Sequence, residues 1–155
     1  MQTKRVLLRF LIFALIGLLI EVFFTAAGRL AHGDWNAHGH TSPIMMLDYG
    51  LLGVVLMPIA RPFIKRGVPL VFRAVVYMLG IFVVEYVSGI IFTWGFGLRI
   101  WNYSNLPFNL HGQITLLYAP FWWGLGLFAE YLYRKVDAVA VLLLRGVTAE
   151  ELEAL

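Results

Sequence analysis

Apolar residues occur along this chain in long uninterrupted blocks, at residues 10–28, 42–60, 70–94 and 114–133. A helix needs about 20 predominantly apolar residues to cross a bilayer, and each block is about that long. The pattern therefore predicts an all-α membrane protein with four transmembrane helices, arranged as two helical hairpins. We expect residues 1–135 to form this bundle and residues 136–155 to form a cytoplasmic helical tail.

The predicted tail carries two signals of its own. Residues 136–144 are apolar but too few to cross a bilayer, which favours an amphipathic helix at the cytoplasmic surface or a helix packed on the bundle. Thr148 and Glu151 have the spacing of a capping box, in which the glutamate side chain binds the threonine amide. This spacing predicts a last short helix that begins at Thr148.

The composition agrees with a protein that lies mostly in lipid. The chain is 61% hydrophobic and 14% charged, whereas soluble domains carry about 25% charged residues. It has no cysteine, which excludes disulfide bonds, thiolate metal sites and a cysteine nucleophile. The net charge of +3 does not indicate a nucleic-acid partner, because the basic residues flank apolar blocks and do not form one face.

The basic residues also predict the orientation of the helices. Ten of the twelve Lys and Arg lie before the first block, between the second and third blocks, near the start of the third block or after the fourth block. Only Arg29, after the first block, and Arg99, after the third block, would lie on the other side of the membrane. Cytoplasmic loops of membrane proteins are enriched in Lys and Arg, so we expect both termini to be cytoplasmic. The lipid bilayer is then the first partner, and a bacterial inner membrane is the expected location.

Each predicted span contains one acidic residue: Glu21, Asp48, Glu85 and Glu130. An ionisable side chain in hydrocarbon costs at least about 2.5 kcal/mol, so it needs a partner, a cavity or a functional path. Arg134 follows Glu130 by four residues, which predicts an ion pair on the helix surface and a structural role. Glu21 and Glu85 lie on stripes of small and polar residues, which fit either plain helix packing or a polar cavity open to the outer side.

The two halves of the chain follow a similar pattern. In each half, a helix with one glutamate is followed by a Trp-Asn pair, a His-Gly pair and a return helix. A parallel duplication would explain this likeness, and it would match Glu21 with Glu85 and His38 with His111.

A possible metal site lies in the loop after the first block, which holds His32, Asp34, His38 and His40. Imidazole and carboxylate groups together suit zinc, copper, nickel or iron. The spacing matches no standard metal motif, and histidines in loops at a membrane surface are more often solvated. A metal therefore stays a hypothesis, and we expect no other cofactor.

Several short motifs resemble a known membrane family, and they are Glu21-Val22-Phe23-Phe24-Thr25-Ala26-Ala27, Gly39 with Thr41-Ser42, Tyr49-Gly50, Glu85 with Gly89, Trp101-Asn102-Tyr103-Ser104, and Phe108-Asn109-Leu110-His111-Gly112-Gln113-Ile114. From about residue 17 to residue 133, the chain resembles the ABC-transporter type IV (CmpB-like) family, to which the animal transmembrane protein 229 group is similar. The family pattern usually has Trp-Asp-Tyr-Ser, so Asn102 replaces an acid here. The resemblance implies a shared fold and a shared polar site on the outer side.

Three functions remain open at this point. The first is a transport-related protein, oligomeric, whose outward polar site admits a small solute or a lipid headgroup. The second is a non-catalytic accessory or assembly subunit docked to a larger membrane complex. The third is an intramembrane enzyme that modifies lipid, which is less favoured because no nucleophile stands out, and we predict no catalytic residue. The predicted ligand-binding residues are Glu21, Thr25, Asp48, Glu85, Trp101, Asn102, Tyr103, Asn109 and His111.

Overall fold

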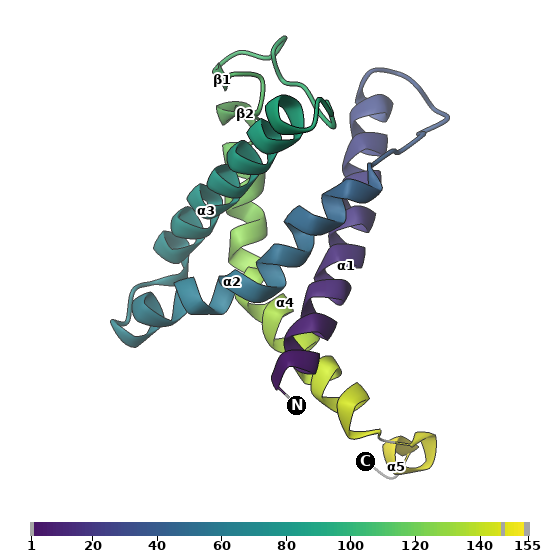
Figure 1. The fold of residues 1–155 in the computed structure, drawn as a ribbon, viewed down its shortest axis with the longest axis vertical. Helices are drawn as coiled ribbons and strands as arrows, with labels where there is room; N and C mark the ends of the chain where they lie inside the picture. Colours follow the sequence, from purple (N-terminus) through teal and green to yellow (C-terminus); the bar gives the residue numbers. More distant parts are fainter. Residues whose placement is uncertain (1, 147, 154–155) are drawn as a thin grey trace. The chain divides into compact units, whose positions relative to one another are not determined.

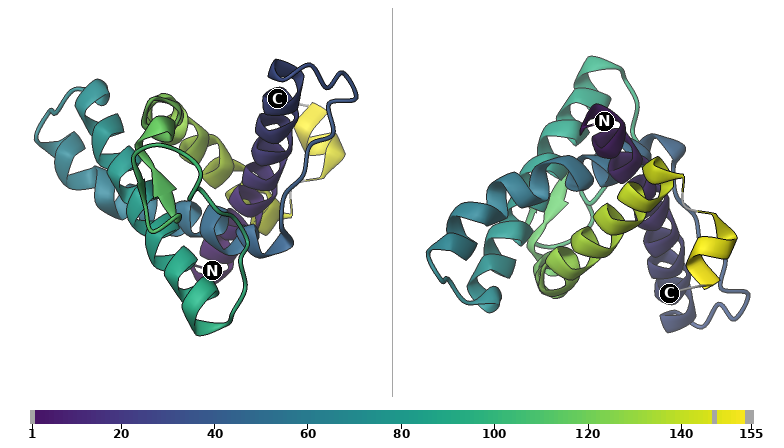
Figure 2. Two further views of the ribbon diagram at one scale, coloured as in Figure 1. Left: turned by 90° about the horizontal axis from the view of Figure 1, so that it is seen from above. Right: turned by 90° about the horizontal axis from the view of Figure 1, so that it is seen from below.

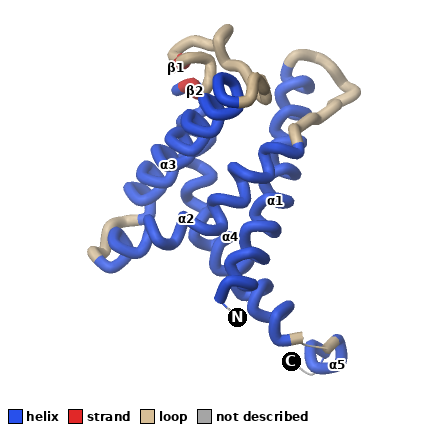
Figure 3. The backbone as a smooth tube through the Cα atoms, in the orientation of Figure 1, coloured by secondary structure: helices blue, strands red, loops and turns tan. Residues whose placement is uncertain are grey.

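Long α-helices make up most of the computed structural model, which describes residues 2–146 and 148–153 (Figures 1 and 3). The helices are α1 (Gln2–Ala31), α2 (Met46–Lys65), α3 (Leu70–Ile90), α4 (Ala119–Arg145) and α5 (Ala149–Glu153). A short hairpin of β1 (Asn109–Leu110) and β2 (Ile114–Thr115) lies between α3 and α4 in the sequence. The chain divides into unit 1, with the residues up to 55 and from 131 onward, and unit 2, residues 56–130.

Three helical segments are long and apolar enough to cross a membrane, namely Gln2–Ala31, Pro43–Lys65 and Leu70–Gly95. They coincide with the first three predicted spans, so the prediction of a membrane protein is confirmed. Helix α4 is not among them, because Glu130, Arg134 and Lys135 lower its hydropathy. A fourth crossing is therefore not shown by length and composition.

Helices α1 and α3 each expose an apolar stripe in which large side chains recur at every fourth position. The stripe on α1 is 40–67% exposed and consists of Leu7, Leu11, Leu15, Leu19 and Phe23. The stripe on α3 is 38–62% exposed and consists of Val71, Val75, Leu79, Val83 and Val87. Each member of the second stripe lies 64 residues after a member of the first, the separation of Glu85 from Glu21 (85 − 21 = 64). A duplication would give such a pattern, and the duplication stays a prediction.

Glycines end both α1 and α2. Gly33 and Gly67 have positive φ angles of 83° and 69°, a left-handed conformation that costs glycine little. The next amide, that of Val68, donates to the carbonyl of Phe63 at 3.0 Å, which closes the end of α2. The second apolar block predicts a helix that ends at residue 60, but α2 runs to Lys65 with Pro58 and Pro62 inside it. Membrane helices tolerate such prolines, because the lost backbone hydrogen bond can be compensated locally.

The start of the predicted fourth span is wrong. Residues 114–118 are not α-helical: β2 pairs with β1, and a 3-10 turn (Leu116–Tyr118) follows before α4 begins. The hairpin turn has His111 and Gly112 at φ angles of 52° and 69°, and Gln113 N donates to Leu110 O at 3.0 Å. Thr115 is 1% exposed and donates to Pro107 O at 2.8 Å. These local hydrogen bonds hold the apolar segment in a hairpin.

Helix α4 continues into the predicted tail without a break, as far as Arg145 (Figure 2). Thr148 N then donates to Glu151 Oε2 at 3.0 Å, and Glu151 N donates to Thr148 Oγ1 at 3.3 Å. The predicted capping box is thus confirmed, and α5 follows it directly.

Candidate functional site

Glu21 in unit 1 is bound by hydroxyl groups. Its Oε2 atom accepts hydrogen bonds from Thr41 Oγ1 at 2.5 Å and from Tyr49 OH at 2.8 Å. Among the described residues, no Lys, Arg or His lies within ion-pair distance of Glu21. This carboxylate, on a helix long and apolar enough to cross a membrane, therefore has hydrogen bonds only from neutral donors among the described residues.

A glycine on α1 allows Tyr49 to reach Glu21. Tyr49 lies in the first turn of α2, next to the half-buried Asp48, whose acidic charge suits a helix N-terminus. Gly17 lies one turn before Glu21, and a Cβ atom added there would be only 2.2 Å from Tyr49 Cγ. The absence of a side chain at Gly17 is thus what lets the two helices come together at this site.

The loop after α1 is tied to the same turn of the helix. His40 N donates to Thr25 Oγ1 at 2.9 Å, and Thr25 Oγ1 is 3.0 Å from the carbonyl oxygens of Glu21 and His40. At Gly39, an added Cβ would lie 2.1 Å from the carbonyl oxygen of Val22. Thr25, predicted to bind a ligand, thus anchors the loop that brings Thr41 to Glu21.

Glu85 in unit 2 lies in a similar setting. It is only 7% exposed, and its Oε1 accepts a hydrogen bond from Tyr103 OH at 3.0 Å. The Tyr103 ring packs edge-on against Tyr118, with ring centroids 5.3 Å apart. The two residues that the sequence pairs, Glu21 and Glu85, thus each accept a hydrogen bond from a tyrosine of their own unit.

Trp101 supports the loop above α3. Its Nε1 donates to Gln113 O at 2.8 Å, and Gln113 Nε2 donates to Thr93 Oγ1 at 3.2 Å. Gln113 is 5% exposed and packs on Gly89, where a Cβ would be 2.2 Å from Gln113 Oε1 and 3.0 Å from Trp101 Cζ2. Gly89 follows Glu85 by four residues, as Thr25 follows Glu21, so in each unit this position contacts the loop.

Two predicted ligand-binding asparagines fold this loop. Asn102 Oδ1 accepts hydrogen bonds from the amide and the hydroxyl of Ser104, at 3.0 and 2.6 Å. Asn109 Nδ2 donates to Leu106 O at 2.7 Å, and its Oδ1 accepts from Gly112 N at 3.1 Å. Their side-chain amides thus determine the shape of the loop that positions Tyr103.

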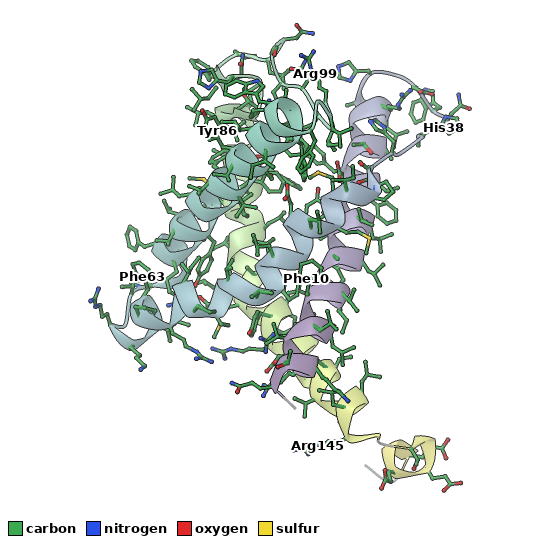
Figure 4. All side chains as sticks on the ribbon, in the orientation of Figure 1. Phe10, His38, Phe63, Tyr86, Arg99 and Arg145 are labelled. Carbon is green, nitrogen blue, oxygen red and sulfur yellow. The ribbon has the colours of Figure 1, made fainter. Side chains whose placement is uncertain are left out.

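His38 and His111, which the predicted duplication would match, are both exposed and lie in the segments that connect the helices. His111 is exposed, and its Nδ1 is 2.8 Å from Tyr86 OH, while its ring centroid is 6.1 Å from that of Trp94. His38 is exposed on the loop that follows α1, away from the helix axis (Figure 4). Neither histidine has a hydrogen bond to a glutamate in the described part of the chain.

Glu130 has a different partner from the predicted one. It is 6% exposed, and Arg73 Nε and Nη2 donate to its two oxygens at 2.6 and 3.0 Å. Tyr77 OH donates to it at 2.5 Å. The predicted helix-surface pair with Arg134 is therefore wrong, because α4 turns Glu130 toward α3 and away from the surface.

An acid that the sequence reasoning missed, Asp137, forms a similar cluster in unit 1. Arg5 Nε and Arg9 Nη1 both donate to Asp137 Oδ1 at 2.7 Å, and the guanidinium of Arg9 lies 5.0 Å from the centroid of the Tyr133 ring. The available signal was the spacing of Arg5 and Arg9, which places two cations on one face of α1. Arg9 precedes Glu21 by twelve residues, as Arg73 precedes Glu85 (21 − 9 = 85 − 73).

His32, Asp34, His38 and His40, the residues of the metal hypothesis, do not come together in one cluster. His32 Nδ1 lies 2.8 Å from Gly28 O. The pKa of Asp34 lies below its ordinary value, because the backbone amide of Asn36 and the guanidinium of Arg29 donate to its carboxylate. Within residues 2–146 and 148–153, no group of three or more His, Asp or Glu is placed to hold a metal ion.

Two residues of the Glu21 cluster, Thr41 and Tyr49, were not in the predicted set. Both lie far from Glu21 in the sequence, so no spacing rule connects them to it. The signals available were Gly17 on the face of Glu21, which indicates a close helix contact, and the family motifs that contain Thr41 and Tyr49. Neither signal indicates that these two residues bind Glu21.

Comparison with known proteins identifies the family. No solved structure matches the chain. Residues 8–148 match the family model described as "Putative ABC-transporter type IV", which confirms the resemblance inferred from the motifs. The match covers both glutamate clusters and both arginine–carboxylate clusters except Arg5. The chain therefore belongs to the putative ABC-transporter type IV family, whose description marks it as a transport-related membrane protein.

Proposed function

We propose that the protein crosses the membrane four times and binds a small solute or a lipid headgroup at an outward polar site lined by an intramembrane glutamate, Glu21 in unit 1, with Glu85 as its counterpart in unit 2. The observation that carries the proposal is the hydroxyl-only environment of Glu21. Asp137 and Glu130 each have an arginine partner and are thereby neutralised. Glu21 has none among the described residues, although a buried charge in lipid is costly.

The proposed topology adds α4 as the fourth crossing. Its first half is rich in aromatic and small residues, and its charged residues begin only at Glu130. Exposed cations at the ends of the helices opposite to the loops, such as Lys4, Lys65 and Arg145, favour a cytoplasmic location for both termini. The loops that bear Thr41 and Tyr103 then lie on the outer side.

The residues of the site have distinct proposed roles. In unit 1, Glu21 binds the ligand and the hydroxyls of Thr41 and Tyr49 orient its carboxylate. In unit 2, Glu85 has the same role and is oriented by Tyr103. The predicted residues Trp101, Asn102 and Asn109 shape the outer loop. The exposed apolar stripes of α1 and α3 would face lipid or another copy, and four helices form a thin wall for a pathway. We therefore propose a homo-oligomer.

A thermal-shift screen of the full chain in mild detergent tests this function. The panel contains amino acids, amines, inorganic ions and phospholipids, each compared with buffer alone. A ligand at 100 times its Kd stabilises a protein by about 2.7 kcal/mol, which corresponds to a rise in Tm of several degrees for a chain of this size. We expect at least one stabilising compound, and we expect Glu21→Gln and Glu85→Gln each to remove the part of its effect that comes from the site in their own unit.

The control is Glu150→Gln, which changes an exposed acid of α5 and should keep the full shift. Both site variants must also express and elute from a sizing column like the unchanged protein. If they aggregate or fail to accumulate, the glutamates serve helix packing and the proposal is wrong. The proposal is equally wrong if compounds stabilise the site variants as much as the unchanged protein.

A further inference from the structure

We propose that the Glu21 cluster takes up and releases a compact positive charge, either a proton or a small inorganic monovalent cation. The inference rests on the proposed function, because it names the ligand class of the same site. It concerns unit 1 alone and needs only Glu21, Thr41 and Tyr49.

The chemistry of the donor groups points to this class. The side-chain groups that meet at the site are one carboxylate and two hydroxyls, and all of them present oxygen atoms. A carboxylate can hold a proton, and oxygen ligands suit hard cations. A hydroxyl has one donor hydrogen and two lone pairs, so Thr41 and Tyr49 can donate to an ionised Glu21 and also accept from a cation beside it.

The charge balance points the same way. In Asp137 and Glu130, the chain provides the neutralising cation itself, with arginine nitrogens at 2.6–2.7 Å. No described cation lies within ion-pair distance of Glu21. Hydroxyl groups stabilise a carboxylate but leave its net charge unchanged. The remaining charge in a membrane helix is then balanced by a proton or by a cation from solution.

The site is also reachable. Glu21 and Thr41 are only half-buried, and Thr41 belongs to the loop that follows α1. Both hydroxyls donate to Oε2, and no described residue donates to Oε1. The second oxygen is therefore available to a proton or a cation without breaking either hydrogen bond.

Labelling with dicyclohexylcarbodiimide tests the inference on the full chain in detergent. This apolar reagent modifies protonated carboxyl groups, and peptide mass spectrometry locates the modified residue. We expect labelling at Glu21 that declines as the pH is raised, because the reagent needs a protonated carboxyl, and none at Asp137 or Glu130, whose carboxylates are paired with arginines. Tyr49→Phe removes a hydrogen-bond donor to the ionised carboxylate, so Glu21 should be labelled about tenfold faster in this variant than in the unchanged protein at neutral pH.

Added salts separate the two sources of charge. LiCl, NaCl or KCl is compared with N-methylglucamine chloride at the same pH and ionic strength. A proton site is labelled equally in all four salts, whereas a metal-cation site is protected by at least one alkali ion. Either result supports the inference, and Glu21→Gln must abolish labelling at this position in both cases.

The inference is overturned if labelling at Glu21 is absent or independent of pH, provided that no alkali ion has an effect. Infrared spectroscopy gives a readout that needs no reagent to enter: the carbonyl band of a protonated carboxyl at low pH should be reduced in Glu21→Gln. Failure of both readouts, with ligand stabilisation still lost in Glu21→Gln, would refute the charge exchange but leave the proposed function standing. Normal labelling at Glu21, with ligand stabilisation unchanged in Glu21→Gln, would refute the proposed function but leave the charge exchange standing.

Discussion

The contact between Gly17 and Tyr49 makes a quantitative prediction. In Gly17→Ala, the new methyl carbon would lie 2.2 Å from Tyr49 Cγ and 2.4 Å from Tyr49 Cβ, whereas carbon atoms prefer 3.5–4.0 Å. The Cβ atom is fixed to the backbone of α2, so a rotation of the ring cannot relieve the clash. The helices must move apart by more than about 1 Å, and overpacking of this kind costs about 1–3 kcal/mol.

The assay is the apparent Tm of the purified protein in detergent, compared with Gly80→Ala. For a chain of this size, about 1–3 kcal/mol lowers the Tm by roughly 2–12 °C. Gly80 is also helical, but an added Cβ there has no atom within 4 Å. Its replacement should therefore keep or slightly raise the Tm, because alanine favours a helix by up to about 1 kcal/mol over glycine. A Gly17→Ala protein as stable as Gly80→Ala would refute the close approach of Tyr49 to α1.

Three further predictions follow from the clusters. Glu130→Gln leaves the charge of the half-buried Arg73 without its carboxylate, so it should reduce the free energy of unfolding by about 3–5 kcal/mol. A thermal melt should then show a Tm lowered by roughly 10 °C, and an unchanged Tm would contradict the burial of this pair. The hydrogen bonds from Arg5 and Arg9 hold the pKa of Asp137, which lies beyond the predicted fourth span, below its ordinary 3.8. The stabilisation is then complete above about pH 4 and declines as the pH falls further, so melts against pH should show that the advantage over Asp137→Asn shrinks there. Asn109→Ala should release the loop that positions Tyr103 and increase its proteolysis, whereas Asn105→Ala, at an exposed position of the same loop, should not.

The sequence predicts the spanning helices well because a hydrophobic block is a local signal. The first three spans depend only on length and apolarity, and the capping box of Thr148 and Glu151 depends only on spacing. The start of α4 could not be predicted in this way. Residues 114–118 are as apolar as the residues of a predicted transmembrane helix, but hydrogen bonds such as that from Thr115 Oγ1 to Pro107 O hold this segment in a hairpin.

Partners of the acidic residues were harder to predict than the residues themselves. The sequence singled out Glu21 and Glu85, because a charge within an apolar block is conspicuous. It could not identify Tyr49 as the partner of Glu21 or Tyr103 as the partner of Glu85, since these contacts depend on how separate segments pack. The Glu130 pair was wrong for the same reason: a residue four positions away, Arg134, is a local candidate, whereas Arg73 is 57 residues distant.

The outward polar site around Glu21 is the central proposal, and cysteine accessibility tests it most directly. The chain has no cysteine, so Thr41→Cys and Leu15→Cys each introduce a single thiol, the second on the exposed apolar stripe of α1. A membrane-impermeant maleimide is added to intact cells or right-side-out vesicles, and labelling is compared before and after permeabilisation. We expect Thr41→Cys to react from outside without permeabilisation and Leu15→Cys to remain unlabelled. Labelling of Thr41→Cys only after permeabilisation would place Glu21 toward the cytoplasm and contradict the account.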